Sequence, residues 1–206
     1  MAHLEALTEK GTALLPFLGE FTDFYLAGGT ALALEIGHRV SVDFDFFHQE
    51  KIKRTLLLNV EKIFAAHVRH VLVNNANELT LLVDGVKITF LSYPFPVILP
   101  LVCINGMAAL GIQEIAATKA YTIGRRGMFK DYVDVYAIVS GGHITLAELI
   151  TLAERKYGDA FDARLFLEQL VYFDDIEESP IVFLGQPVSI KEIASFFATE
   201  IQKLEI

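Results

Sequence analysis

The sequence predicts an α/β fold, in which a small mixed sheet of about four or five strands with flanking helices is followed by a helical C-terminal part. Three observations lead to this prediction. Runs with the two-residue alternation of strands are concentrated before residue 100. The pair Asp84-Gly85 separates two of these runs, as in a β-hairpin. From residue 112 onward, apolar residues recur at the three- and four-residue spacing of amphipathic helices.

The elements can be placed in order from periodicity and from glycine positions. A first helix is expected at 4–18 and ends at Gly19, and a short strand at 24–27 leads through Gly28 and Gly29 into a helix at 30–36. Gly37 ends that helix, and Thr30 is the expected N-cap. Further strands are expected at 42–47, 68–73, 79–83 and 86–92, a helix at 51–66, and a short edge strand or loop within 99–110. Later helices are expected at 112–123, 129–139, 145–157, 162–172 and 189–204.

Glycines near residue 141 suggest a division of the chain. The run Ser140 to His143, Ser-Gly-Gly-His, is the strongest candidate for a boundary. We therefore expect one domain over residues 1–140 and a helical region over 141–206. The acidic run 173–180 is interpreted as a solvated connection in that region.

Composition and charge narrow the class of protein. The chain has 206 residues, a net charge of −9 and 53% hydrophobic residues. Residues 131–206 carry 14 acidic against 5 basic side chains, whereas residues 1–130 carry 12 of each. A long phosphate backbone should not bind the acidic part, but a nucleotide or one end of an RNA could meet the neutral part. The lone Cys103 excludes an internal disulfide framework, and neither a transmembrane run nor a signal peptide is predicted, so a cytoplasmic location is expected.

Two carboxylates stand in an otherwise apolar strand. Asp43 and Asp45 are two residues apart, so they share one face of the predicted strand 42–47. Divalent cations such as Mg²⁺ or Mn²⁺ would explain them, because hard oxygen ligands suit these metals. Upstream, the Gly28-Gly29-Thr30 turn offers backbone N–H groups and a helix N-terminus to a phosphate, and Arg39 could pair with phosphate oxygens.

Simpler explanations exist for each of these residues. An isolated Asp-x-Asp is most often the solvated polar face of an edge strand, and Ser41 is either a nucleophile or a hydroxyl at the start of a strand. A haloacid-dehalogenase-like phosphatase also uses Asp-x-Asp, but a small hydroxyl residue is usual where this chain has Phe47. The six histidines form no zinc-binding pattern.

Two ordered blocks resemble the nucleotidyltransferase-like toxins of the AbiEii/AbiGii family, in the polymerase-β-like superfamily. The first block is "GGTALAL" followed by "HRVSVDFDFF", and the second is "IAATKAYTIGRRGMFKDYVDVYAI" at 115–138. The resemblance implies a polymerase-β-like nucleotidyltransferase core. It assigns Asp43 and Asp45 to the metal and the catalytic role to these two with Lys119, Asp131 and Asp134. It assigns nucleotide binding to Gly28, Gly29, Thr30, Arg39, Ser41 and Arg126.

The residues of the second block permit other interpretations as well. Lys119 could be a surface lysine on an apolar helix rather than a charge on the triphosphate. Asp131 and Asp134 share a helix face, and either could orient Lys119 or activate the acceptor. Asp131 could instead pair with an arginine of the preceding loop and only hold two helices together, and Arg126 could be a solvated loop residue.

The sequence differs from the polymerase-β-like pattern at one position. Enzymes of that superfamily usually take a third carboxylate from a later strand of the sheet. The matching strand is 86–92, and the position expected to hold the acid is near Thr89, with no acidic residue between Val86 and Tyr93. A single Mg²⁺ is therefore expected.

The resemblance implies a Mg²⁺-dependent transfer of a nucleoside monophosphate from a nucleoside triphosphate (NTP) to an acceptor hydroxyl. The acceptor would be tRNA or another RNA, and the protein would be a toxin controlled by an antitoxin protein. The alternatives are a weakened relative that binds a nucleotide or partner without turnover, and an enzyme acting on a small molecule or a protein.

Overall fold

The computed structural model describes residues 2–174, 176 and 180–204. The chain divides into two compact units, Met1–Pro96 with Pro100–Gly111, and Val97–Leu99 with Ile112–Ile206. The division therefore falls at residue 112 rather than residue 141, because helices α4 (Ile112–Ile123) and α5 (Phe129–Ser140) pack with the later helices. Part of the acidic run 173–180 lies outside the described residues.

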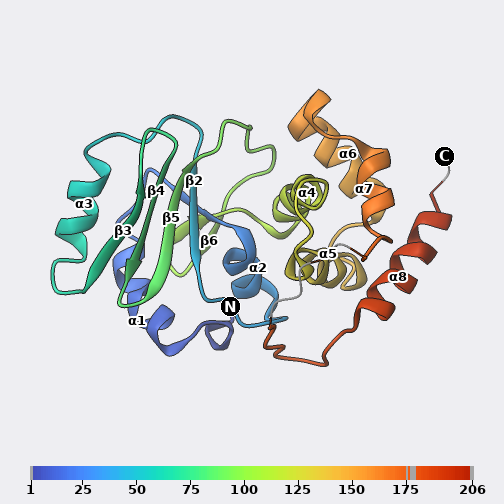
Figure 1. The fold of residues 1–206 in the computed structure, drawn as a ribbon, viewed down its shortest axis with the longest axis horizontal. Helices are drawn as coiled ribbons and strands as arrows, with labels where there is room; N and C mark the ends of the chain where they lie inside the picture. Colours follow the sequence, from blue (N-terminus) through green and yellow to red (C-terminus); the bar gives the residue numbers. More distant parts are fainter. Residues whose placement is uncertain (1, 175, 177–179, 205–206) are drawn as a thin grey trace. The chain divides into compact units, whose positions relative to one another are not determined.

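The first unit contains a seven-stranded mixed sheet (Figure 1). Its strands are β1 Tyr25–Ala27, β2 Phe44–His48, β3 Arg69–Asn74, β4 Glu78–Val83, β5 Val86–Ser92, β6 Val102–Ile104 and β7 Met107–Ala109. Their order is β3-β4-β5-β2-β1-β7-β6. Strand β2 runs antiparallel to β1 and parallel to β5. The count exceeds the predicted four or five because the segment 99–110 forms the hairpin β6–β7.

One face of this sheet carries an aromatic core. Phe46 of β2 stacks on Phe90 of β5, with ring centroids 5.4 Å apart, and Phe21 packs on both rings. Phe64 and Phe17 extend the cluster. Because side chains alternate along a strand, Asp45 and its neighbour Thr89 lie on the opposite face. The predicted alternation therefore separates the core of this unit from its polar face.

The helices of this unit are α1 (Glu9–Leu18), α2 (Gly28–Ile36) and α3 (Leu56–Ile63). The helix predicted at 4–18 is divided, because the hydroxyl of Thr8 accepts the N–H of Gly11 and starts α1 after a short 3-10 turn at Leu4–Ala6. Helix α3 is shorter than the predicted 51–66. Helix α2 ends as predicted at Gly37, which has φ +62.

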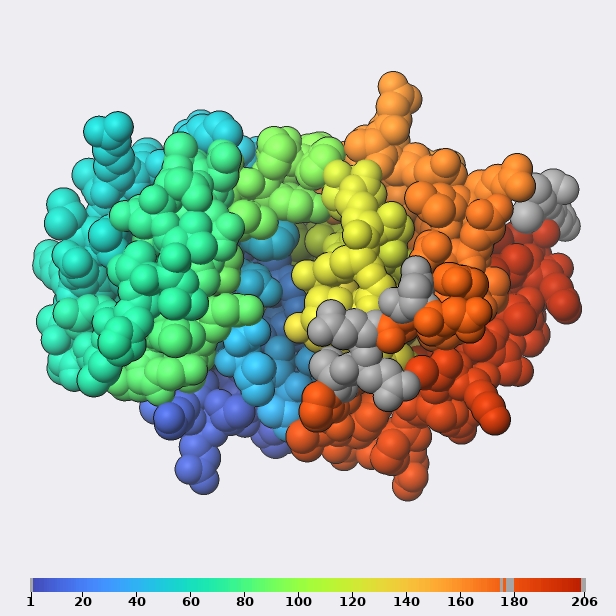
Figure 2. All heavy atoms as spheres, in the orientation of Figure 1, coloured from blue at the N-terminus to red at the C-terminus, as the bar shows by residue number. Residues whose placement is uncertain are grey.

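Strand β3 forms one edge of the sheet, and most of its residues are exposed, including Val71 and Leu72. The blue-green atoms at the left of Figure 2 come from this edge and from α3. The aspartates lie far from this edge in the strand order, because β2 is the fourth of seven strands. The edge-strand explanation is therefore wrong for Asp45, and Asp43 lies in the loop just before β2.

The second unit is helical. After α4 and α5 come α6 (Leu146–Tyr157), the 3-10 turn Gly158–Ala160, α7 (Ala163–Gln169) and α8 (Ile190–Gln202). Capping boxes start α6 at Thr145 with Glu148, and α8 at Ser189 with Glu192. These signals explain why the predicted starts agree with the structure to within one residue. Across the described part of the chain, no helix has the length and apolar character that crossing a membrane requires.

Candidate active site

Asp45 lies against the start of helix α2. The antiparallel register pairs Asp45 with Ala27, the last residue of β1, and the chain passes from Ala27 directly into α2 at Gly28. Gly28 has φ +67, and a Cβ built on it would lie 2.9 Å from Oδ2 of Asp45. Glycine is required here for two reasons: its backbone adopts a positive φ, and the Asp45 carboxylate leaves no room for a Cβ. The carboxylate thus stands at the positive end of a helix.

Asp43 is held by the loop between α2 and β2. The hydroxyl of Thr30 donates to the backbone carbonyl of Asp43, and it lies 2.7 Å from the hydroxyl of Ser41. Thr30 is therefore not the N-cap of α2, which begins two residues earlier at Gly28. Both hydroxyls are buried, with Thr30 3% and Ser41 8% exposed. They fix the backbone that carries Asp43.

Arg39 is also buried in this loop, at 5% exposure, and its Nη1 donates to the carbonyl of Val40 over 3.2 Å. Val42, which was expected to belong to a buried strand, is 56% exposed, and β2 begins only at Phe44. Asp43 itself is 30% exposed at its side chain. In this loop, Arg39 is therefore buried, whereas the Asp43 side chain is partly exposed to solvent.

Strand β5 brings two further side chains to the same face. The parallel register pairs Asp45 with Thr89, which is the position expected to hold a third carboxylate. Lys87 lies two residues earlier on β5, and its Nζ is 3.0 Å from Oδ2 of Asp43. Sequence reasoning missed Lys87. The two-residue alternation around Thr89 was the signal that could have found it.

These residues suit a single divalent cation. A Mg²⁺ ion commonly takes one or two carboxylates and completes its octahedron with water and phosphate oxygens. Asp45 offers one carboxylate on this face of the sheet, and Asp43, in the loop just before β2, offers a second one beside Lys87. In the described part of the chain, no group of three or more histidine, cysteine or acidic side chains could enclose a metal. The chemistry of the donors fits an open site better than a closed protein cage.

The other predicted residues form an ionic cluster in the second unit. Nζ of Lys119 on α4 lies 2.6 Å from Oδ1 of Asp131 and 2.6 Å from Oδ2 of Asp134, both on α5. Lys119 is 5% exposed and both aspartates are fully buried, so the surface-lysine explanation is wrong. The two carboxylates hold the ammonium in one position.

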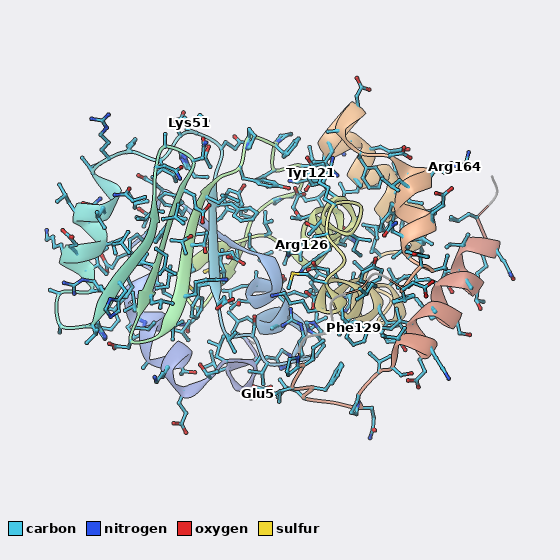
Figure 3. All side chains as sticks on the ribbon, viewed as in Figure 1. Glu5, Lys51, Tyr121, Arg126, Phe129 and Arg164 are labelled. Atoms are coloured by element: carbon cyan, nitrogen blue, oxygen red, sulfur yellow. The ribbon has the colours of Figure 1, made fainter. Side chains whose placement is uncertain are left out.

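Arg126 adds the second positive charge of this cluster. It lies in the turn between α4 and α5 (Figure 3), and its Nε is 3.0 Å from Oδ2 of Asp131. Its side chain is 53% exposed, in contrast to its partner. Two acids and two bases make the cluster formally neutral, which allows it to be buried. The helix-joining role considered for Asp131 is therefore present in the structure.

A second buried ion pair was not predicted. Lys156 of α6 pairs with Glu114 of α4, and the side chains of both are 1% exposed. The Glu114 carboxylate also accepts the N–H groups of Ile98 and Leu99, over 3.2 and 3.0 Å. This pair joins α4, α6 and the segment Val97–Leu99 within the second unit.

Comparison with known proteins identifies the family. The family model described as "Nucleotidyl transferase AbiEii toxin, Type IV TA system" matches residues 12–204. The chain belongs to this AbiEii family. A protein of Aquifex aeolicus (strain VF5), named uncharacterized protein aq_aa25, is 34% identical to it over 189 residues, covering 90% of each chain.

Solved structures show the same fold as this AbiEii-family chain. The nucleotidyltransferase toxin MenT4 of Mycobacterium tuberculosis matches with a TM-score of 0.63 at 18% identity, over 93% of this chain and 81% of that one. JHP933 of Helicobacter pylori matches with a TM-score of 0.61 at 19% identity, over 95% and 92%. The predicted resemblance and the α/β nucleotidyltransferase fold are confirmed. Family membership supports a nucleotidyltransferase toxin.

Proposed function

We propose that this AbiEii-family chain transfers a nucleoside monophosphate from an NTP to an acceptor hydroxyl, using Mg²⁺ or Mn²⁺. The observation that carries the proposal is the Asp45 carboxylate at the N-terminus of α2, with a second carboxylate, Asp43, two residues earlier in the chain and 3.0 Å from Lys87 of the neighbouring strand. That arrangement joins a hard-metal donor set to a helix end that favours phosphate.

Each residue of this face would have a defined task. Asp43 and Asp45 would hold the cation, and the backbone at Gly28 and Gly29 would face the phosphates. A bound Mg²⁺ would neutralise charge that develops on the phosphate oxygens during the displacement. The buried hydroxyls of Thr30 and Ser41 would keep the loop fixed, so most of the rate enhancement would come from positioning and charge.

Lys119, Asp131 and Asp134 are assigned to the same reaction by the resemblance in sequence. Within their unit, both carboxylates lie 2.6 Å from the Lys119 ammonium, which supports a fixed charge rather than a mobile surface lysine. We propose that Lys119 acts on the phosphates and that the two aspartates orient it. Arg126, which is half exposed, remains a proposed nucleotide contact.

The acceptor and the partner are proposed from the family. A toxin of a type IV toxin–antitoxin system implies a separately encoded antitoxin, and a tRNA or another RNA is the proposed acceptor. The acidic second unit is unsuited to a long phosphate backbone, so contact with one end of an RNA is the favoured mode.

The test uses each NTP labelled at the α-phosphate, with Mg²⁺ or Mn²⁺, and with or without total tRNA. The wild-type protein should transfer label to an acceptor, and Asp45→Asn and Lys119→Met should not. Asp23→Asn, which changes an exposed aspartate of the first unit, is the matched control and should retain activity. A wild-type protein that labels no RNA, protein or small molecule would contradict the transferase.

The second candidate function is nucleotide binding without turnover. It is favoured by Thr89, a neutral residue directly beside Asp45 in the register. The same experiment separates the two candidates, because this alternative predicts retained NTP binding by wild-type protein together with no label transfer.

A further inference from the structure

Lys87 makes an ion pair with one of the two proposed metal ligands. Its Nζ lies 3.0 Å from Oδ2 of Asp43, and the two side chains are 41% and 30% exposed. An ion pair this exposed contributes little to stability, because water and salt screen it. Its importance therefore lies in its position beside the metal ligands.

The register explains why this lysine reaches Asp43. Strand β5 runs parallel to β2 and pairs Thr89 with Asp45. Lys87 precedes Thr89 by two residues on β5, so both side chains lie on the face of the sheet that carries Asp45. Asp43 lies in the loop one residue before β2 begins, and its ion pair with Lys87 places its carboxylate beside this face. Strand β5 thus places the Lys87 ammonium beside Asp43 and the neutral Thr89 side chain beside Asp45.

The net charge of these side chains favours one bound divalent cation over two. Two aspartates, Lys87 and one divalent cation give a net charge of +1. A second divalent cation would raise the net charge to +3, and it would have to approach a carboxylate whose Oδ2 already faces an ammonium. Like charges a few ångströms apart still repel near a protein surface, where water screens only part of their interaction.

We infer that Lys87 is a positioning residue that takes the place of a second metal ion, so that the site binds a single divalent cation. Lys87 competes with the metal for the Asp43 carboxylate and supplies one of the positive charges that a second metal would supply. This inference rests on the proposed function, because it presumes that Asp43 and Asp45 bind a metal.

The experiment is a titration of the full-length protein with Mn²⁺, followed by electron paramagnetic resonance and by calorimetry. Wild-type protein should bind one Mn²⁺ per chain, and Asp45→Asn should lose it. Lys87→Met should bind Mn²⁺ about tenfold more tightly, because a cation that competes for Asp43 is gone. Lys87→Arg, which keeps the charge, should resemble the wild type.

Lys62→Met is the matched control, because Lys62 is an exposed lysine on α3 of the same unit. It should leave the Mn²⁺ affinity unchanged. A purely structural role of Lys87 would weaken metal binding or leave it unchanged, so the expected rise in affinity distinguishes the two roles. Circular dichroism before each titration verifies that the variants are folded.

Two results would overturn the inference alone. One is a wild-type protein that binds two Mn²⁺ ions, both lost in Asp45→Asn, and this result needs no variant of Lys87. The other is a single Mn²⁺ in the wild type that Lys87→Met binds no more tightly than Lys62→Met does. If wild-type protein binds no Mn²⁺ that Asp45→Asn abolishes, the metal site of the proposed function fails together with the inference.

Discussion

Replacing Gly28 by alanine tests the strand-to-helix turn on which the proposed metal site depends. Gly28 has φ +67, where an L-residue with a Cβ costs about 1–2 kcal/mol. In addition, the new Cβ would lie 2.9 Å from Oδ2 of Asp45, a distance at which one of the two groups must move. Since Gly28 directly follows the paired strand β1 and begins α2, we expect the carboxylate rather than the backbone to move. Gly28→Ala should therefore lose metal affinity as well as stability.

Gly106→Ala separates these two effects. Gly106 belongs to the same unit and has φ +83, but apart from Gly106 and its two chain neighbours no atom of the described residues lies within 4 Å of the position that its new methyl group would take. It carries the backbone penalty of about 1–2 kcal/mol without the contact. Urea denaturation should show a loss of stability in both variants, and Mn²⁺ titration of the folded proteins should show weaker binding only for Gly28→Ala. Equal Mn²⁺ affinity in the two variants would refute the reasoning.

Two further predictions concern the helical unit. Lys156→Met leaves the buried carboxylate of Glu114 without its counter-charge, so it should lower the free energy of unfolding, measured by urea titration, by about 3–5 kcal/mol. The double variant with Glu114→Gln should recover much of this loss. A Lys156→Met variant as stable as the wild type would contradict the prediction. Hydrogen bonds from the backbone and hydroxyl of Thr145 hold the pKa of Glu148 below its ordinary value of 4.5. A carboxylate with a lowered pKa stabilises the fold at pH values above its unfolded-state pKa, and this stabilisation is lost as the pH falls through its folded-state pKa. The difference in free energy of unfolding between wild type and Thr145→Ala should therefore be constant near neutral pH and become smaller in acid. A gap that widens in acid would exclude this assignment.

The helices were predictable because their signals are local. Residue 112 starts α4 and residue 123 ends it, as the apolar spacing predicts, and Gly37 ends α2 in the left-handed conformation that favours glycine. The start of β2 was not predictable in this way. The carbonyl of Asp43 accepts the hydroxyl of Thr30, a contact across 13 residues, and the strand begins only at the next residue, Phe44.

In the candidate site, too, features that depend on contacts between distant residues could not be predicted from the sequence. The aspartates and the Gly28 turn were found as a motif, and Thr89, where a third acid was expected, lies directly beside Asp45 in the register. Lys87 was missed although the alternation around Thr89 places it on the same face of β5, because periodicity within one strand does not show that its ammonium reaches Asp43. The burial of Lys119 depended likewise on two carboxylates contributed by a second helix.

The two negative charges at strand β2 are tolerated because each meets a different source of positive charge. Asp45 stands at the N-terminus of α2, whose partial charge is fixed in the backbone, whereas Asp43 faces Lys87, whose ammonium is carried on a flexible side chain. Only the second of these can move aside. A cation entering the proposed site must therefore compete with Lys87 for Asp43. The phosphates of an incoming nucleotide would offer Lys87 another partner, so metal and nucleotide should favour each other's binding at this face.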